Sequence, residues 1–147
     1  MNSTIHASAV LIGARAVLIR GPSGAGKSRL AWDLINSAPD PIPFARLIAD
    51  DRAFVEARHG RLLVRPAPEL AGLVEVRGLG IRRLPYEPVA VVGLVVDLAA
   101  SDADRLPPHE TLKATIGSIT LPRLPVPTSD PALPGLLAII RTAAAGD

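Results

Sequence analysis

Eight residues, Gly21 to Ser28, combine three glycines, a lysine and a hydroxyl side chain in the order G-x-x-x-x-G-K-S. In a phosphate-binding loop of this pattern, backbone N–H groups wrap a polyphosphate, and the glycines permit the close approach. The lysine bonds the β- and γ-phosphate oxygens, and the hydroxyl ligates Mg²⁺. The pattern therefore predicts a nucleotide-binding loop composed of Gly21, Pro22, Ser23, Gly24, Ala25, Gly26, Lys27 and Ser28.

Two adjacent carboxylates, Asp50 and Asp51, follow the short apolar segment Leu47–Ala49. In a nucleotide site, one such acid can assist Mg²⁺ and another can accept a proton from an attacking hydroxyl. Without the upstream loop, a solvated turn would be the simpler interpretation. With the loop present, the pair is predicted to be functional.

Other polar residues are ambiguous when taken alone. Glu75 and Arg77 lie among apolar residues and would point to one side of an extended segment, which indicates an ion pair on a strand before a flexible turn. His6 is a lone histidine, and most such residues lie on a surface or in a core.

The segments around the loop must position these groups. Apolar residues 7–12 and 16–19 predict a β-hairpin whose second strand enters the loop. Residues 27–38 repeat apolar side chains at helical spacing, so a helix is predicted there, ended by Pro39. A second hairpin is predicted over residues 54–65.

The C-terminal half offers weaker signals. The valine-rich run 89–98 predicts a central strand covered on both faces. Residues 101–117 are polar and predict a loop with a short element. Prolines within residues 119–126 favour an edge strand. Asp130 could cap a last helix over residues 131–144.

Composition excludes several classes of protein. The 147 residues suffice for one domain, and with 48% apolar but only 3% aromatic residues the core must be aliphatic. The net charge is +2 without a basic cluster, which argues against nucleic-acid binding. Cysteine is absent, so disulfides and thiolate metal sites are excluded. Neither a signal peptide nor a membrane-spanning stretch is evident, so a cytoplasmic protein without membrane partners is expected.

In their order along the chain, these pieces resemble the catalytic domain of HPr kinase/phosphorylase, a bacterial family that phosphorylates a serine of the phosphocarrier protein HPr. The segment from Glu75 to Ile81 is the most diagnostic, because phosphate-loop proteins in general lack it. The matching features are His6, Gly21–Ser28, Leu47–Arg52, Ala67–Leu70, Glu75–Ile81, Leu121–Pro127 and the final apolar helix.

The resemblance implies a fold and an assembly. The expected fold is α/β, a phosphate-loop kinase domain related to phosphoenolpyruvate carboxykinase, with a mixed sheet and flanking helices. Residues 1–147 would form a single catalytic domain without a separate regulatory domain. A homo-oligomer, by resemblance a hexamer, is expected.

It also implies roles for the site residues, with ATP and Mg²⁺ as the cofactors. Lys27 would hold the phosphates, Ser28 and Glu75 would hold Mg²⁺, and Asp50 would be a second carboxylate near the metal. Asp51 would accept the proton of the serine hydroxyl and return it in the reverse reaction.

His6 matches a family active-site histidine, and a bond that orients Asp51 is our hypothesis for it. A family arginine after Ile81 lacks an obvious counterpart, which leaves Arg82 or Arg83 as candidates. The family's loop begins Gly-Asp where this chain has Gly21-Pro22. A basic Gly-Arg-Asn loop, associated with dephosphorylation, is replaced by residues 128–134, which favours kinase over phosphorylase activity.

The sequence thus predicts an ATP- and Mg²⁺-dependent serine kinase that acts on HPr or an HPr-like protein and regulates the phosphotransferase system. One alternative is a small-metabolite kinase, although such enzymes usually carry an arginine-bearing lid and none is evident. Another is a non-catalytic nucleotide sensor. The presence of both Asp51 and Glu75 argues against it, because binding alone needs no proton acceptor.

Overall fold

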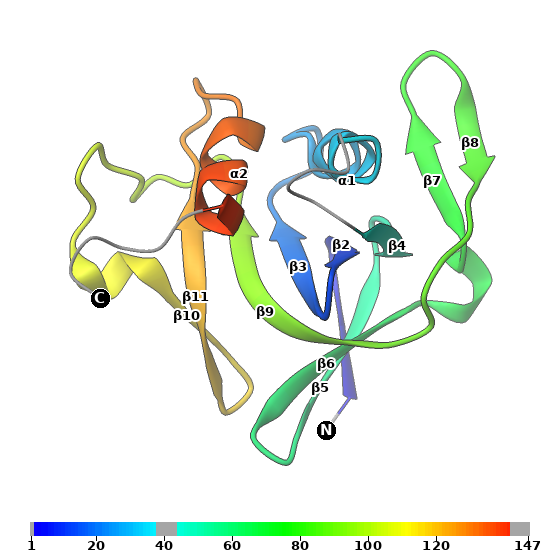
Figure 1. Ribbon diagram of the computed structural model, residues 1–147, viewed down its shortest axis with the longest axis horizontal. Coiled ribbons are helices and arrows are strands. Elements are labelled where there is room, and N and C mark those ends of the chain that lie inside the picture. Colours follow the sequence, from blue (N-terminus) through cyan, green and yellow to red (C-terminus); the bar gives the residue numbers. More distant parts are fainter. Residues whose placement is uncertain (1, 38–43, 142–147) are drawn as a thin grey trace.

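The computed structural model describes residues 2–37 and 44–141. Within these residues, nine strands form one curled mixed sheet in the order β1-β5-β6-β9-β3-β2-β4, with β11 beside β9 and β10 beside β11 (Figure 1). The strands of this sheet are β1 (Asn2–Ile5), β2 (Ala7–Ile12), β3 (Arg15–Arg20), β4 (Ala45–Ala49), β5 (Ala53–Arg58), β6 (Arg61–Pro66), β9 (Ala90–Asp97), β10 (Lys113–Ile116) and β11 (Ile119–Pro125).

The remaining elements are few and short. Strands β7 (Leu73–Val76) and β8 (Gly80–Arg83) form a separate hairpin that projects beside α1 (Figure 1). The helices are α1 (Lys27–Ile35), α2 (Leu133–Arg141) and the 3₁₀ turns η1 (Pro68–Leu70) and η2 (His109–Leu112). Within the described ranges, no helix is long and apolar enough to cross a membrane.

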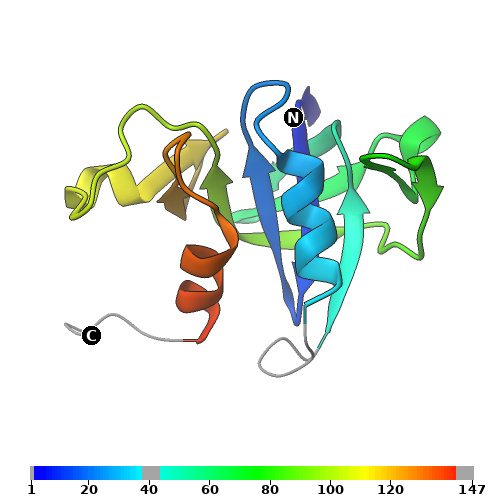
Figure 2. The same cartoon turned by 90° about the horizontal axis from the view of Figure 1, so that it is seen from above.

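Strand β9 lies at the centre of the sheet, as its valine-rich sequence predicts. Along one edge, its first residues pair with β6 and its last residues pair with β11. Along the other edge it pairs with β3, which runs parallel to it. Val95 packs into a core on one face with Leu18. Val96 packs on the other face against Leu34 of α1 and Leu136 of α2. Both helices therefore cover the same face, where α1 lies over β2, between β3 and β4 (Figure 2).

The strand directions gather several chain segments at one edge of the sheet. Strands β3 and β4 both pair antiparallel with β2, so they run parallel to each other. Strands β9 and β11 also run in the direction of β3. The carboxyl ends of four strands and the start of β2 therefore meet at this edge, where open α/β sheets place their ligands. The Gly21–Ser28 loop follows β3 there.

Both predicted hairpins and the strand before Asp50 are confirmed, but the first helix is shorter than predicted. It ends at Ile35. The Asn36 Nδ2 atom donates to the Trp32 carbonyl oxygen at 2.8 Å, and the Ser37 hydroxyl donates to that of Asp33 at 2.7 Å. The Trp32 carbonyl also accepts from the Asn36 N–H at 3.1 Å, as in a helix, whereas the Ser37 hydroxyl satisfies the Asp33 carbonyl that a longer helix would have used. The predicted last residue, Ala38, and Pro39 lie outside the described residues.

The edge-strand prediction for residues 119–126 is wrong. Strand β11 lies between β10 and β9: Pro122 pairs with Lys113 of β10, and residues 123–125 pair with β9. The prolines are tolerated because β11 changes partner next to Pro122, so each neighbour uses part of the strand. The edge strand here is β10, which has four residues. It was not predicted because residues 101–117 are polar and indicated a loop.

The last helix also begins later than predicted. It starts at Leu133, so Asp130 is not its cap; the Asp130 N–H instead closes a turn onto the Pro127 carbonyl oxygen at 3.2 Å. The predicted apolar face is confirmed, since Leu136 is fully buried and its apolar neighbours on the helix pack around it. Residues 142–144 of the predicted helix lie outside the described part of the chain.

An ion cluster joins the carboxyl ends of β3, β9 and β11. Asp97 accepts hydrogen bonds from Arg20 at 2.7 and 2.9 Å and from Arg123 at 2.5 Å. Burial raises the pKa of the Asp97 carboxyl, but the bonds from Arg20 and Arg123 outweigh this effect and hold the pKa below its ordinary value. Because Arg20 directly precedes Gly21, the cluster anchors the entry to the loop.

Replacing Asp97 by asparagine is expected to lower the free energy of unfolding at pH 7 by about 1–3 kcal/mol, the range for hydrogen bonds to charged groups. A carboxyl whose folded pKa is lowered stabilises the protein above its unfolded pKa of about 3.9 and loses that effect as the pH falls through the folded value. The difference in the free energy of unfolding between wild type and Asp97→Asn, measured by urea denaturation, should therefore become smaller below about pH 4. Exposed Asp104→Asn is the control, and a pH-independent difference would contradict the assignment.

Candidate active site

Backbone geometry shapes the Gly21–Ser28 loop. Gly26, immediately before α1, has φ of +100°, which strains any residue with a side chain. A Cβ atom at Gly21 would lie 3.0 Å from the Leu98 Cβ, so a side chain there would require Leu98 or the loop to shift. Lys27 is buried, and its Nζ donates to the carbonyl oxygens of Gly21 at 2.8 Å and Pro22 at 3.2 Å. The ammonium group thus lies across the start of the loop.

The Asp50 carboxylate is the hub of a buried hydrogen-bond network. The Ser28 hydroxyl lies 2.7 and 2.9 Å from its two oxygens, and the Ser8 hydroxyl donates to it at 2.7 Å. The Glu75 backbone N–H donates to it at 3.1 Å. One side chain therefore ties the end of β4 to the loop helix, to β2 and to the projecting hairpin.

Asp51 occupies a strained turn. Its φ is +69°, a left-handed value that is uncommon for residues other than glycine. The Arg52 N–H donates to the Asp50 carbonyl oxygen at 2.8 Å and closes a three-residue turn around Asp51. The Asp51 N–H donates to the Ser8 hydroxyl at 3.2 Å, and its carbonyl accepts from Ala7 at 3.2 Å. Strain held in this way is typical of functional sites.

A cleft of about 600 Å³ brings most of the predicted site residues together. Lys27 and Ser28 line it from the loop helix, and Asp51 and Glu75 line it from the strand ends. Both carboxylate side chains are exposed, whereas Lys27 is buried at the base of the loop. The other lining residues are Ser23, Gly24, Gly26, Arg29, Trp32, Val76 and Arg77.

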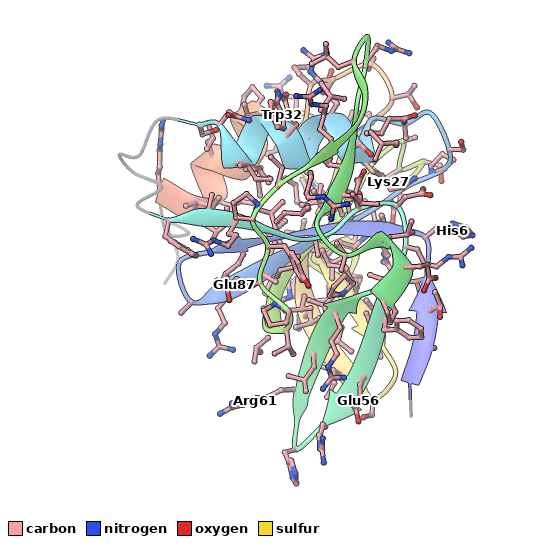
Figure 3. All side chains as sticks on the ribbon, turned by 90° about the vertical axis from the view of Figure 1, so that its right-hand side faces the viewer. His6, Lys27, Trp32, Glu56, Arg61 and Glu87 are labelled. Carbon is pink, nitrogen blue, oxygen red and sulfur yellow. The ribbon has the colours of Figure 1, made fainter. Side chains whose placement is uncertain are left out.

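His6 lies at the bend between β1 and β2, exposed and outside the residues that line this cleft. Figure 3 shows it at the same end of the molecule as Lys27, away from the β5–β6 hairpin that carries Glu56 and Arg61. Its neighbour Ala7 bonds the Asp51 carbonyl, so His6 adjoins the Asp51 turn through the backbone. The orienting role of His6 stays a prediction.

The arginines of the cleft are not the ones that the resemblance left as candidates. Arg82 and Arg83 lie exposed on β8 and do not line the cleft. Arg29 of α1 and Arg77, at the turn between β7 and β8, do line it. The hairpin therefore brings Arg77 and Glu75 of one short segment to the same cleft.

The donor atoms of the site fit a magnesium ion. Mg²⁺ takes oxygen ligands, keeps several waters and usually binds one or two carboxylates together with substrate phosphates. The Ser28 hydroxyl and the Glu75 carboxylate offer such oxygens, and Asp50 holds the Ser28 hydroxyl. The described residues contain no group of three histidine, aspartate or glutamate side chains that would form a metal cage by itself. The arrangement thus suits a metal that shares its ligands with a phosphate substrate.

Sequence reasoning missed Ser8 as a functional residue. Ser8 is fully buried in β2, and its hydroxyl bonds both the Asp50 carboxylate and the Asp51 backbone. The available signal was a single hydroxyl within the apolar run 7–12, close to the predicted loop. Buried hydroxyls need partners, so this residue had to face another polar group.

Replacing Ser8 by alanine is expected to reduce the free energy of unfolding by about 1–3 kcal/mol, because the Asp50 oxygen and the Asp51 N–H each lose a buried partner. Chemical denaturation measures the change, with Ser3→Ala on the exposed part of β1 as the matched control. Equal stability of Ser8→Ala and wild type would show that water replaces the hydroxyl without cost.

Comparisons with known proteins agree with this architecture. The family model described as "HPr Serine kinase C-terminal domain" matches residues 1–144. An HPr kinase/phosphorylase of Geobacillus thermodenitrificans is 35% identical over 138 residues, covering 86% of this chain and 42% of the relative. That of Limosilactobacillus reuteri is 43% identical over 81 residues, covering 54% of this chain and 23% of the relative. The chain spans less than half the length of these curated relatives.

A solved structure shares the fold. The Hpr(Ser) kinase/phosphatase from Coxiella burnetii superposes with a TM-score of 0.72 and 25% sequence identity, over 95% of this chain and 88% of that one. The mixed α/β architecture, a curled mixed sheet with few helices, is therefore the one found in that protein.

Proposed function

The chain belongs to the family of HPr serine kinase C-terminal domains, and on that premise we propose that it is an ATP- and Mg²⁺-dependent protein-serine kinase. Its substrate in this proposal is HPr or an HPr-like phosphocarrier protein, so that the reaction regulates the phosphotransferase system. The fold is proposed to act as a phosphate-loop kinase domain, with residues 1–147 as one catalytic unit.

One observation carries the proposal: Lys27, Ser28, Asp51 and Glu75 line a single cleft. A phosphate-binding lysine and hydroxyl thus face two exposed carboxylates. A nucleotide-binding module needs the first two groups, but a proton acceptor is useful only when a hydroxyl attacks the phosphate. Phosphoryl transfer to a hydroxyl is therefore the chemistry that the arrangement supports best.

The proposed reaction forms a bond between the serine oxygen and the γ-phosphorus and breaks the bond from that phosphorus to the β–γ bridging oxygen, so ADP leaves. The Asp51 carboxylate accepts the hydroxyl proton. The loop N–H groups and Lys27 hold the phosphate chain in line and balance its charge. Bound Mg²⁺, held by Ser28 and Glu75 with Asp50 behind Ser28, would neutralise charge on the transferred group. His6 is proposed to orient Asp51.

The test is to incubate the protein with MgATP and candidate phosphocarriers and to map phosphoserine by mass spectrometry. The expected result is one modified serine on one carrier, absent when the ATP or the Mg²⁺ is left out. Absence of phosphoserine on every carrier would contradict the proposal and favour a metabolite kinase or a nucleotide sensor.

Adding orthophosphate to the purified phosphoprotein then tests the reverse reaction. We propose that kinase activity predominates, because residues 128–134 contain no basic side chain. Rapid loss of the phosphoryl group upon addition of orthophosphate would contradict this part of the proposal.

A further inference from the structure

A second pocket adjoins the phosphate loop on the side away from Asp51. Its volume is about 410 Å³, within the range of about 300–1,000 Å³ that small-molecule sites occupy. It shares Gly24, Gly26 and Arg29 with the cleft described above, whereas Asp51 and Glu75 line the cleft alone. The loop thus separates two cavities that meet along its glycines.

The far walls of this pocket come from the ends of β9 and β11. Leu98 and Val126, both more than nine-tenths buried, present apolar side chains to it. Backbone hydrogen bonds fix these strand ends to each other, from the Val126 N–H to Asp97 and from the Ala100 N–H to Val126, each at 2.9 Å. The Leu98 N–H also donates to the Arg20 carbonyl oxygen at 2.8 Å, directly before the loop. The pocket is therefore preformed.

Polar groups also line this pocket. Asp33 and Arg29 reach it from α1, and Thr128 reaches it from the segment between β11 and α2. The Arg29 Nε and Asp33 Oδ2 atoms form an ion pair at 3.4 Å, which leaves the other guanidinium nitrogens as donors and the other carboxylate oxygen as an acceptor. The Thr128 hydroxyl can both donate and accept. Apolar walls with a few such polar groups are suited to an aromatic heterocycle with polar edges.

The two cavities constrain how a nucleotide can lie. Under the proposed function, the γ-phosphate and the acceptor serine must face Asp51, which lies in the cleft. If the γ-phosphate of a nucleotide on the loop lies toward Asp51, its α-phosphate lies at the other end of the phosphate chain, away from Asp51. The second pocket opens from the same glycines on that side.

We propose that the pocket between the loop, Leu98 and Thr128 binds the adenosine part of ATP. This inference rests on the proposed function and adds the site of the nucleoside. Thr128 and its neighbours would then serve nucleotide binding, in a segment where the family resemblance assigns this chain no role.

The test compares MgATP with magnesium tripolyphosphate, which carries the phosphates but no nucleoside, by calorimetry. Thr128→Trp fills the pocket from an exposed position, and Ser129→Trp adds the same bulk to an adjacent exposed residue that does not line it. We expect Thr128→Trp to weaken ATP binding about tenfold or more while tripolyphosphate binds as in wild type, because the phosphate contacts remain. Ser129→Trp should change neither affinity.

A second measurement needs no variant. Photolysis of wild-type protein with 8-azido-ATP should label the peptides containing residues 98–99 or 126–133. Labelling at residues 75–77, or equal wild-type affinity for ATP and tripolyphosphate, would overturn the nucleoside site while leaving the phosphate site intact. Failure of both phosphate compounds to bind would overturn the proposed function itself and this inference with it.

Discussion

Asp51→Asn is expected to lower the turnover of phosphoryl transfer to the carrier by about 10²–10⁴-fold, the contribution typical of a general base. An amide cannot accept the hydroxyl proton, whereas the phosphate contacts of Lys27 and the loop remain. The affinity for MgATP should therefore be unchanged. Single-turnover kinetics and calorimetry on the same preparation measure the two quantities.

The geometry of the turn indicates that Asp51→Asn removes the carboxylate without disturbing the backbone. Asp51 has φ of +69°, and asparagine tolerates left-handed backbone about as well as aspartate does. The bonds from Arg52 and to Ser8 involve backbone atoms of the turn, so the variant keeps them. Asp104→Asn, exposed in the segment after β9, is the matched control. A turnover equal to that of wild type would remove Asp51 from the role of proton acceptor.

The phosphate loop could be predicted from the sequence because its parts are local. Glycine spacing, the strand before it and the helix after it all lie within residues 15–35, and the structure places them as expected. The proximity of Asp50 to Ser28 is different, because it depends on β4 running parallel to β3 through their shared partner β2. The loop upstream of the Asp50–Asp51 pair favoured a role for the pair in the nucleotide site, and the family resemblance added that Asp50 lies near the metal.

The features that sequence reasoning missed depend on contacts between distant segments. Ser8 acquires its role only where β2 passes beside Asp50, which lies 42 residues further along the chain. Arg77 enters the cleft because the β7–β8 hairpin folds toward α1, through the bond between the Glu75 N–H and Asp50. No periodicity encodes such a contact.

Element ends were mispredicted for a related reason. The first helix ends where the Asn36 and Ser37 side chains bond its carbonyls, although its apolar repeat continues. The last begins after Pro131, where the Ala132 carbonyl oxygen accepts from Leu136 at 3.1 Å. Hydrophobic period locates a helix, but short side chains that bond the backbone decide where it stops.

Lys27→Ala is expected to weaken MgATP binding by about 10–10²-fold, since a hydrogen bond to a charged group contributes about 1.5–3 kcal/mol and 1.4 kcal/mol is a factor of ten. Trp32 is the single tryptophan of the chain and lines the same cleft, so its fluorescence can report the binding. Turnover should also fall, because the ammonium group balances charge on the transferred phosphate.

Loss of binding in this variant should not reflect unfolding. The carbonyl oxygens of Gly21 and Pro22, which Lys27 bonds, belong to partly or fully exposed residues that water can reach. Lys113→Ala, at the other lysine of the chain and exposed on β10, is the matched control for loss of a positive charge. Because the Ser28–Asp50 network stays in place, Lys27→Ala isolates the contact between the ammonium group and the phosphates. Undiminished MgATP affinity in a folded Lys27→Ala protein would mean that residues 21–28 do not bind the nucleotide phosphates.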